Sequence, residues 1–226
     1  MNIYMDIETI PTSNPQVIER IAAKVTPPGS MKKAETIAKW EAEDKPAAVE
    51  QAVSKTGLNG GYGRVCCIGW AIDPQPGDVD AEVESLSITE DTNDDERSML
   101  QTFFDKVLER QHGPFKWIGH NIARFDLRFL YHRCVVLGID TYGLLPVNVK
   151  PWDEGIADTM VMWAGATEFI SLDELCNILG FDGKGDVTGA DVAGLFKEGK
   201  VDEIAEYCMA DVVRTILVHS RLSRVR

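Results

Sequence analysis

The sequence lacks the short motifs on which several large classes of enzyme depend. Its five cysteines form no CxxC pair, its four histidines are scattered, and it contains neither a P-loop nor a G-x-S-x-G turn. These absences speak against a zinc site, P-loop nucleotide hydrolysis and serine-hydrolase chemistry. The cysteines lie mostly in apolar runs, where we expect small buried side chains in a reducing compartment: Cys66, Cys67, Cys134, Cys176 and Cys208.

Long apolar segments are also missing. The longest apolar-rich stretch, Val65–Ile72, is too short to cross a bilayer. Met1–Ile10 carries acidic residues where a signal peptide needs an apolar centre, so we expect a cytoplasmic protein with no membrane partner. The chain has 226 residues, of which 44% are hydrophobic and 26% charged, as expected of a single globular domain over residues 1–226.

Basic residues are scarce, with 23 Lys and Arg against 36 Asp and Glu and a net charge of −13. The balance is uneven: Asp73–Glu96 holds ten acids and no base, Gln16–Arg64 eight bases and six acids, and Phe115–Lys150 five bases and two acids. Non-specific affinity for nucleic acid comes from Lys and Arg that neutralise phosphates. We therefore expect the protein to bind a short end of a nucleic-acid strand rather than to cover a duplex along its length.

The hydrophobic pattern predicts an α/β fold in which helices cover a mixed β-sheet. The expected strands are Asn2–Ile7, Arg64–Ile72, Ala81–Ile88 and Phe115–Gly119. The expected helices are Asp94–Arg110, Phe125–Leu137, a helix from the capping box at Ser171 to Leu179, and about Asp202–Leu222. The segment at about Pro11–Tyr62, rich in Ala, Lys and Glu, predicts two or three helices inserted between strands one and two. Its local basic balance suggests contact with substrate or a partner.

Asp6 and Glu8 lie two residues apart in the first expected strand, so their side chains point the same way. Burying ionised carboxylates is costly unless a positive group pairs with them. The pair can therefore form part of a cation site. Alternatively, Glu8 lies in solvent beyond the end of the strand and Asp6 caps a turn; D-x-E alone does not decide.

Two further acids fall at positions that suit a ligand. Asp126 follows an apolar strand and a polar turn, where it can interact with a helix dipole or hold a ligand at the sheet edge. Tyr207 and Asp211 are four residues apart and share one helix face. Four carboxylates suit two hard cations such as Mg²⁺ or Mn²⁺. Two such ions about 4 Å apart can clamp the attacking and leaving oxygens of a phosphoryl transfer.

These residues, taken in order, resemble motifs I, II and III of the DEDD exonucleases, which have an RNase H-like fold. The matching segments are Asp6-Ile-Glu8, Asn121…Phe125-Asp126 and Tyr207-x-x-x-Asp211. The tyrosine matches the DEDDy branch, because the histidine branch would place His where this chain has Glu206. Ser171–Leu175 and Gly189–Asp211 are similar to stand-alone relatives of the family B DNA polymerase proofreading exonuclease. The resemblance covers roughly Met1–Ile10 and Gly63–Leu222, so the insertion at about Pro11–Tyr62 departs from it.

The resemblance implies a 3′→5′ exonuclease that hydrolyses nucleic-acid 3′ ends with two divalent metal ions, Mg²⁺ or Mn²⁺, and favours single-stranded DNA over RNA. Asp6, Glu8, Asp126 and Asp211 would bind the metals, and Tyr207 would orient the attacking water. Substrate contacts would come from the backbone of Thr9, from Asn121 and from the neighbourhood of Phe125.

Several alternatives stay open at this stage. Asn121 can equally be a turn residue, and Phe125 a core residue. An exoribonuclease of the same fold would differ in its contacts to the 2′-hydroxyl, and a non-catalytic nucleic-acid-binding or interaction module would keep the fold alone. Protein partners are not indicated. Asp158 is expected to cap a helix rather than bind metal. The remaining polar candidates are given no catalytic role: His112, His120, His132, His219, Lys150 and Lys184.

Overall fold

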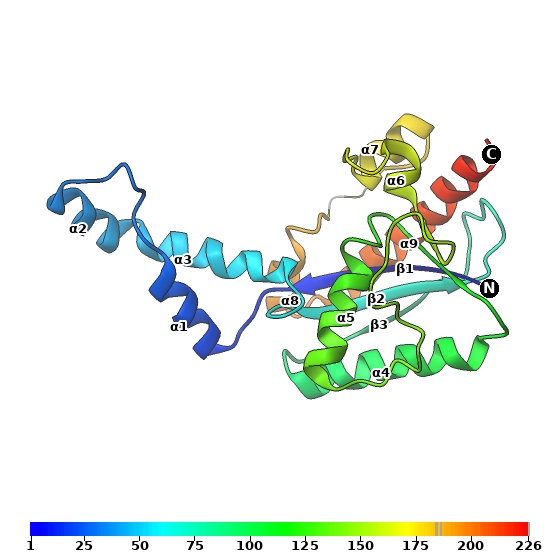
Figure 1. Ribbon diagram of the computed structural model, residues 1–226, viewed down its shortest axis with the longest axis horizontal. Coiled ribbons are helices and arrows are strands. Elements are labelled where there is room, and N and C mark those ends of the chain that lie inside the picture. The colour runs from blue at the N-terminus through cyan, green and yellow to red at the C-terminus, as the bar shows by residue number, and fades with distance from the viewer. Residues whose placement is uncertain (184, 186, 226) are drawn as a thin grey trace.

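The computed structural model describes residues 1–183, 185 and 187–225, which form a mixed sheet flanked by helices, with a helical arm at one end (Figure 1). The strand order is β3-β2-β1-β4-β5. β1 runs antiparallel to β2 and parallel to β4, β3 is antiparallel to β2, and β5 is parallel to β4. The strands are β1 (Asn2–Ile10), β2 (Arg64–Ile72), β3 (Glu84–Ser87), β4 (Lys116–Gly119) and β5 (Ile156–Asp158). The predicted mixed α/β sheet is confirmed, while Lys184 lies outside the described residues.

Helices cover both faces of the sheet. α9 (Val201–Ser223) packs along one face against β1 and β2, whereas α4 (Asn93–Arg110) and α5 (Asp126–Leu137) pack on the other (Figure 1). Because successive side chains of β1 point to opposite faces of the sheet, the strand contributes residues to both faces. Tyr4 reaches α9, where its hydroxyl lies 2.8 Å from His219 Nδ1. Three short helices also contact α9: α6 (Thr159–Ala164), α7 (Leu172–Leu179) and α8 (Val192–Lys197).

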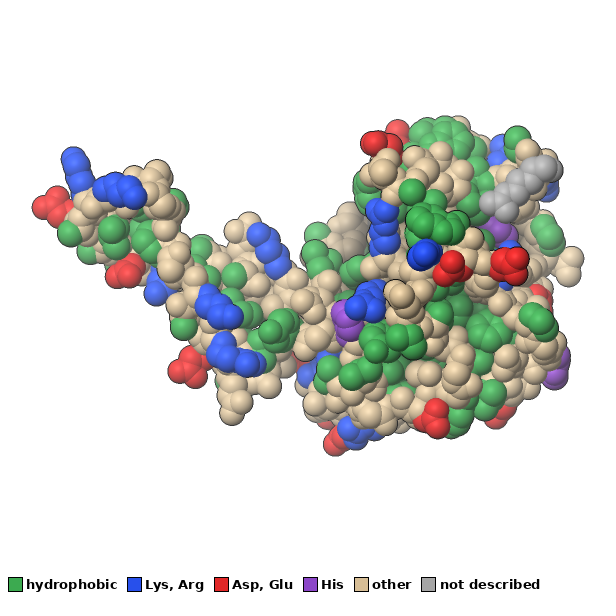
Figure 2. Space-filling model, viewed as in Figure 1, with side chains coloured by type: hydrophobic (Ala, Val, Ile, Leu, Met, Phe, Trp, Pro, Cys, Tyr) green, Lys and Arg blue, Asp and Glu red, His purple; other side chains and the backbone are tan. Residues whose placement is uncertain are grey.

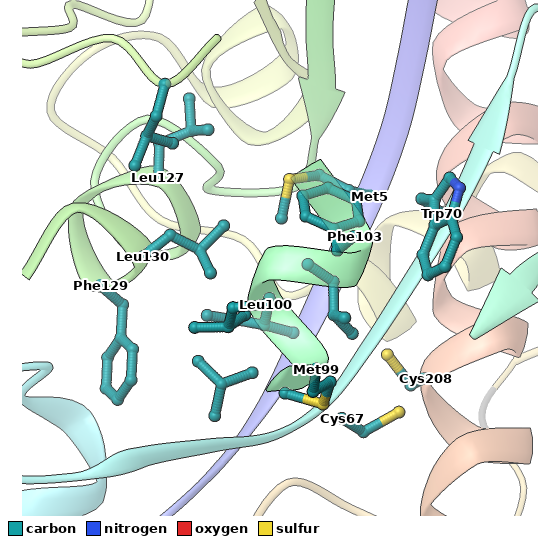
Figure 3. Packing of buried hydrophobic residues seen from close by; sticks show 14 of the residues in the cluster. Met5, Cys67, Trp70, Met99, Leu100, Phe103, Leu127, Phe129, Leu130 and Cys208 are labelled. Atoms are coloured by element: carbon teal, nitrogen blue, oxygen red, sulfur yellow. The ribbon is translucent and has the colours of Figure 1, made fainter. Parts of the chain in front are cut away.

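The core lies between the sheet and the pair α4 and α5. Figure 3 shows Met5 of β1 and Trp70 of β2 close to Phe103 of α4, and the rings of Trp70 and Phe103 are 5.1 Å apart. Burying one side chain of this size stabilises the fold by roughly 1.5–3 kcal/mol. All five cysteines are buried and free, in agreement with the prediction that they are small buried side chains.

Capping residues define several helix ends. Ser171 Oγ accepts the amide of Glu174 at 3.1 Å and begins α7, as the capping box predicts. Gly138 adopts a left-handed conformation (φ 66°) and ends α5. Asp158 accepts the amides of Met160 and Val161 at the start of α6. The prediction that Asp158 caps a helix is therefore confirmed.

The difference from the sequence prediction that bears most on the site concerns the end of β1. The strand continues to Ile10 rather than ending at Ile7, because Thr9 and Ile10 pair with Val65 and Arg64 beyond an irregularity at Glu8/Thr9. Glu8 is therefore inside the strand and buried. The alternative that placed Glu8 in solvent beyond the strand end is wrong.

Another strand is shorter than predicted. β3 spans Glu84–Ser87 rather than Ala81–Ile88, because these four residues form the ladder with β2. β5, α6 and α8 were not predicted, since three to six residues carry too little hydrophobic pattern to be recognised.

The insertion predicted between strands one and two is helical. It contains α1 (Pro15–Lys24), α2 (Ala34–Glu43), α3 (Lys45–Ser54) and the 3₁₀ turn η1 (Lys55–Leu58). Figure 1 shows these elements projecting from the sheet at the carboxyl end of β1, and we call them the arm.

None of the helices in the described part of the chain combines the length and the apolar character needed to cross a membrane.

Candidate active site

The site forms where β1 faces α9. Asp6 and Glu8 alternate with the core residues of β1 and therefore point toward the helix. Asp6 lies opposite Gly69 of β2, and a Cβ there would come within 3.1 Å of Cys208 Sγ on α9. Figure 3 shows Cys208 beside Cys67 of β2. The absence of a side chain at Gly69 thus lets α9 lie close to the strand that carries both acids.

Asp211 of α9 completes a cluster with these two acids. One carboxylate oxygen from each of Asp6, Glu8 and Asp211 lies within 4.8 Å of the other two. We call these three residues the acidic cluster. Glu8 is 8% exposed and Asp211 6%, so water screens their mutual repulsion poorly.

Asp126 lies beside this cluster. Within β1, the residues that pair with β4 are Asn2–Tyr4, which leaves the second half of β1 open on that side to the segment that begins α5. Asp126 is the first residue of α5, and its Oδ1 accepts the amide of Ile7 at 3.3 Å. Residues 119 positions apart in the sequence are thereby joined at the site.

Burial and repulsion raise the pKa of two of these acids, Asp6 and Asp126. Burial raises the pKa of Asp6 well above its usual range, and Glu8, Asp126 and Asp211 raise it further. Burial also raises the pKa of Asp126 to about 8, against the opposing effect of backbone hydrogen bonds. A helix N-terminus alone would lower that pKa. The dominant physical feature of the site is therefore a set of closely spaced, buried carboxylates that raise the pKa of one another, an environment that a bound cation would relieve.

Tyr207 occupies the same face of α9 as Asp211, one turn earlier. Its hydroxyl is hydrogen-bonded to the Asp211 side chain. Burial raises the pKa of Tyr207 far above its usual value, and the charges of Asp211, Glu8 and Asp6 add to the effect. The hydroxyl therefore keeps its proton at neutral pH and acts as a hydrogen-bond donor, not as a base.

One charged partner of the cluster was missed by sequence reasoning. Arg214 Nη1 donates to Asp211 Oδ1 at 2.6 Å, and Nη2 donates to the carbonyl of Gly183 at 3.0 Å. Its position three residues after Asp211 on a helix is a spacing typical of ion pairs, which could have indicated the contact.

The residues predicted to contact the substrate are Thr9, Asn121 and Phe125. Each of them contacts another part of the protein. Thr9 follows Glu8, and its hydroxyl donates to the carbonyl of Gly57 at 2.7 Å. Asn121 has a left-handed backbone (φ 62°), and its backbone amide donates to Asp158 Oδ1 at 2.9 Å, so its main chain forms a turn while a substrate contact of its side chain stays a prediction. Phe125 is partly buried and packs 5.7 Å from the ring of Phe129.

His120 and Asp158, both close to the site, make structural contacts. His120 Nδ1 lies 2.9 Å from Thr159 Oγ1, and its Nε2 lies 2.9 Å from the carbonyl oxygen of Ile170. Asp158 accepts backbone amides on both sides of the sheet edge, including those of Asn121 and Ala123. The absence of a catalytic role for His120 and of metal binding by Asp158 stays a prediction.

Comparison with known proteins identifies similar sequences and structures. A family model described as "Predicted 3'-5' exonuclease related to the exonuclease domain of PolB" matches residues 58–226. No curated protein matches the sequence. Among solved structures, the fold is similar to that of the family B DNA polymerase from the hyperthermophilic archaeon Pyrobaculum calidifontis, with 15% identity and a TM-score of 0.58. The match covers 98% of this chain but spans only 24% of the polymerase.

Proposed function

Since the chain belongs to the family of predicted 3′-5′ exonucleases related to the exonuclease domain of PolB, we propose that it hydrolyses phosphodiester bonds at the 3′ end of DNA, single-stranded DNA in preference. The observation that carries the proposal is the acidic cluster of Asp6, Glu8 and Asp211, with Asp126 beside it. The relationship to a DNA polymerase domain favours DNA over RNA.

The donor set fits divalent metal. Carboxylate oxygens are the ligands that Mg²⁺ and Mn²⁺ prefer, and three of them lie within 4.8 Å of one another. We assign Asp6, Glu8, Asp126 and Asp211 as the residues that would hold two ions. When bound, such ions stabilise the charge on the attacking and leaving oxygens and lower the pKa of the attacking water.

The protein residues then position the reacting groups. Tyr207, whose hydroxyl stays protonated and is hydrogen-bonded to Asp211, would orient the attacking water. Arg214 holds Asp211 in place through a 2.6 Å contact. The backbone of Thr9, next to Glu8, and the side chains of Asn121 and Phe125 would contact the terminal nucleotide. Positioning of this kind supplies much of the catalysis in phosphoryl transfer.

Degradation of end-labelled strands tests the proposal. Single- and double-stranded DNA and RNA, labelled at the 5′ end, are incubated with Mg²⁺, Mn²⁺ or EDTA. We expect stepwise shortening of single-stranded DNA from its 3′ end with either metal and none in EDTA, and Asp211→Asn serves as the inactive control. Circular single-stranded DNA should resist cleavage.

Each unexpected result of this experiment would contradict a different part of the proposal. Cleavage of circular and linear DNA at equal rates would contradict an exonuclease, and undiminished activity in EDTA would contradict metal dependence. Faster degradation of RNA would indicate an exoribonuclease of the same fold. No cleavage of any strand would leave a non-catalytic nucleic-acid-binding module.

A further inference from the structure

A groove on the arm lies apart from the acidic cluster. It runs between α1 on one side and α3 with η1 on the other and has a volume of ≈ 310 Å³. Val17 and Ile21 of α1 supply apolar lining, and Tyr62 lies at the groove with 49% of its surface exposed. Figure 2 shows several Lys and Arg side chains on the surface of this projecting arm.

Three basic side chains converge on this groove: Arg20, Lys24 and Lys55. Among the residues that the structure describes, no acidic one lines it. Arg20 and Lys24 are one turn apart on α1, while Lys55 begins η1, so two separate elements direct positive charge to one place. All three are exposed, and within the described part of the chain none of them forms an ion pair. By contrast, Lys39 on α2 pairs with Glu43.

A structural explanation accounts for part of this pattern. Lys24 is in the last turn of α1, where a positive charge interacts favourably with the helix dipole. That effect does not explain why Arg20 and Lys55 face the same groove, nor why an exposed tyrosine lies among them. Basic side chains combined with an aromatic ring are typical of surfaces that bind single-stranded nucleic acid.

The groove has a fixed position relative to the acidic cluster. Thr56 lines the groove, and its Oγ1 accepts the amide of Thr12 at 2.9 Å. The next residue, Gly57, accepts the hydroxyl of Thr9, which directly follows Glu8. η1 therefore joins the groove to the end of β1 that carries the cluster.

The base of the arm is also held against α5. Arg133 Nη1 donates to the carbonyl of Gly60 at 3.2 Å, while Nη2 of the same arginine pairs with Glu96 at 2.6 Å. A Cβ at Gly60 would come within 2.6 Å of the Phe129 carbonyl oxygen, so the absence of a side chain permits this close packing. A strand whose 3′ end is at the cluster can thus pass η1 and continue onto the arm.

We propose that this groove binds the sugar-phosphate backbone of the substrate strand upstream of its 3′-terminal nucleotide. Arg20, Lys24 and Lys55 contact phosphates, and Tyr62 stacks on a base. The proposal deepens the exonuclease function and rests on it, but it concerns binding rather than cleavage. It also explains how a chain of net charge −13 retains a polyanion.

Fluorescence anisotropy with labelled oligothymidylates of increasing length tests the groove. The measurements are made in EDTA, which keeps the strands intact, over a range of salt concentrations. One variant combines Arg20→Gln, Lys24→Gln and Lys55→Gln. The matched control combines Lys32→Gln, Lys33→Gln and Lys39→Gln, which removes the same charge from exposed positions elsewhere on the arm.

The groove variant should lose about tenfold or more in affinity for long strands at low salt. Its slope of log affinity against log salt should fall by about 2, since three phosphate contacts each contribute about 0.7 for a single strand. The control should lose much less, about twofold, because none of its three lysines lines the groove. Tyr62→Ala should lose about fivefold or more without changing the salt slope, because a ring carries no charge.

The groove proposal and the exonuclease proposal can be contradicted independently of each other. Equal losses in the groove variant and the control would overturn the proposal, because net charge alone would then matter. Unchanged affinity in the groove variant, or wild-type binding too weak to measure, would also overturn it, and an acidic protein surface would become the occupant to test. Absence of cleavage with metal present would contradict the exonuclease function while leaving these binding differences readable. Circular dichroism of each variant confirms that the arm stays helical.

Discussion

Arg214 contacts Asp211 from within the same helix, with Nη1 2.6 Å from Oδ1. The two side chains are 13% and 9% exposed, so water screens the pair only weakly. The second nitrogen of Arg214 donates to Gly183, which joins α9 to the segment after α7. In the metal-free protein, Arg214 therefore supplies positive charge at one edge of the acidic cluster.

Replacing Arg214 by Gln should destabilise the metal-free protein. Asp211 would lose its charged partner while Asp6 and Glu8 remain close, and breaking a mostly buried pair of this kind costs about 1–3 kcal/mol. For a chain of this size that corresponds to a fall in Tm of about 5 °C. Mn²⁺ should then raise Tm more in the variant than in wild type, because it relieves more repulsion.

Thermal melts with EDTA and with Mn²⁺ measure both effects. Arg221→Gln is the control, since it removes one exposed positive charge from the same helix without touching Asp211. Equal responses of the two variants to Mn²⁺ would show that Arg214 does not act on the acidic cluster.

Tyr207→Phe and Asp211→Asn should differ in severity. The first removes the hydroxyl that orients one water, and we expect kcat to fall about tenfold to hundredfold. The second removes a metal ligand, which is worth several kcal/mol of transition-state stabilisation, or about a thousandfold. Single-turnover degradation of labelled DNA compares them.

Tyr4→Phe is the matched control. It also removes a tyrosine hydroxyl on the α9 side of β1, but that hydroxyl is hydrogen-bonded to His219 and not to the acidic cluster. Wild-type kcat in Tyr207→Phe on every substrate would rule out the water-orienting role.

Much of the fold could be predicted because its main elements carry long, regular patterns. α4, α5 and α9 have apolar stripes of three turns or more, and α5 and α7 have end signals in Gly138 and Ser171. The strand β2 is almost entirely buried and reads as one apolar run. Their predicted bounds accordingly lie within one residue of those observed.

The rest depends on partners that are distant in the sequence. Glu8 belongs to the strand because it pairs with Cys67 of β2, and the strand continues through Thr9 and Ile10, whose partners are also more than fifty residues later. Local pattern carries no sign of that pairing. The proposed ligands could be named in order from the motifs, but the contacts of Asp126 with Ile7 and of Arg214 with Gly183 arise from tertiary packing.

The metal-free protein should become less stable as pH rises. Burial raises the pKa of Asp126 from 3.8 to about 8, so the folded state holds a proton that the unfolded chain has already released. Between those two values the folded state binds more protons, and its stability falls with increasing pH, by at most about 1.4 kcal/mol per pH unit for one carboxyl. The raised pKa of Asp6 acts in the same direction.

Denaturant unfolding in EDTA at a series of pH values between 5 and 8, taken about one unit apart, measures this slope. Asp126→Asn should flatten it, which separates the carboxyl from histidines that titrate in the same range. A stability that rises toward pH 8 in wild type, or an equal slope in the variant, would contradict the assignment.

Asp126→Asn should also separate a metal ligand from a structural aspartate. The amide keeps the shape of the side chain and retains an oxygen that can accept the amide of Ile7, now 3.3 Å away. It also removes the cost of protonating this carboxyl on folding, because burial raises the pKa of Asp126 to about 8 in the folded protein. We therefore expect a metal-free protein at least as stable as wild type, a smaller gain in Tm from Mn²⁺, and loss of nuclease activity.

Asp158→Asn provides the comparison, because Asp158 is equally buried but is held by backbone amides at the start of α6. Its substitution weakens charge-assisted hydrogen bonds, so the metal-free protein should lose stability while its response to Mn²⁺ stays that of wild type. The two variants thus change apo stability in opposite directions. Equal Mn²⁺ stabilisation of wild type and Asp126→Asn would mean that Asp126 binds no metal, and the two-metal mechanism would then lack its fourth carboxylate.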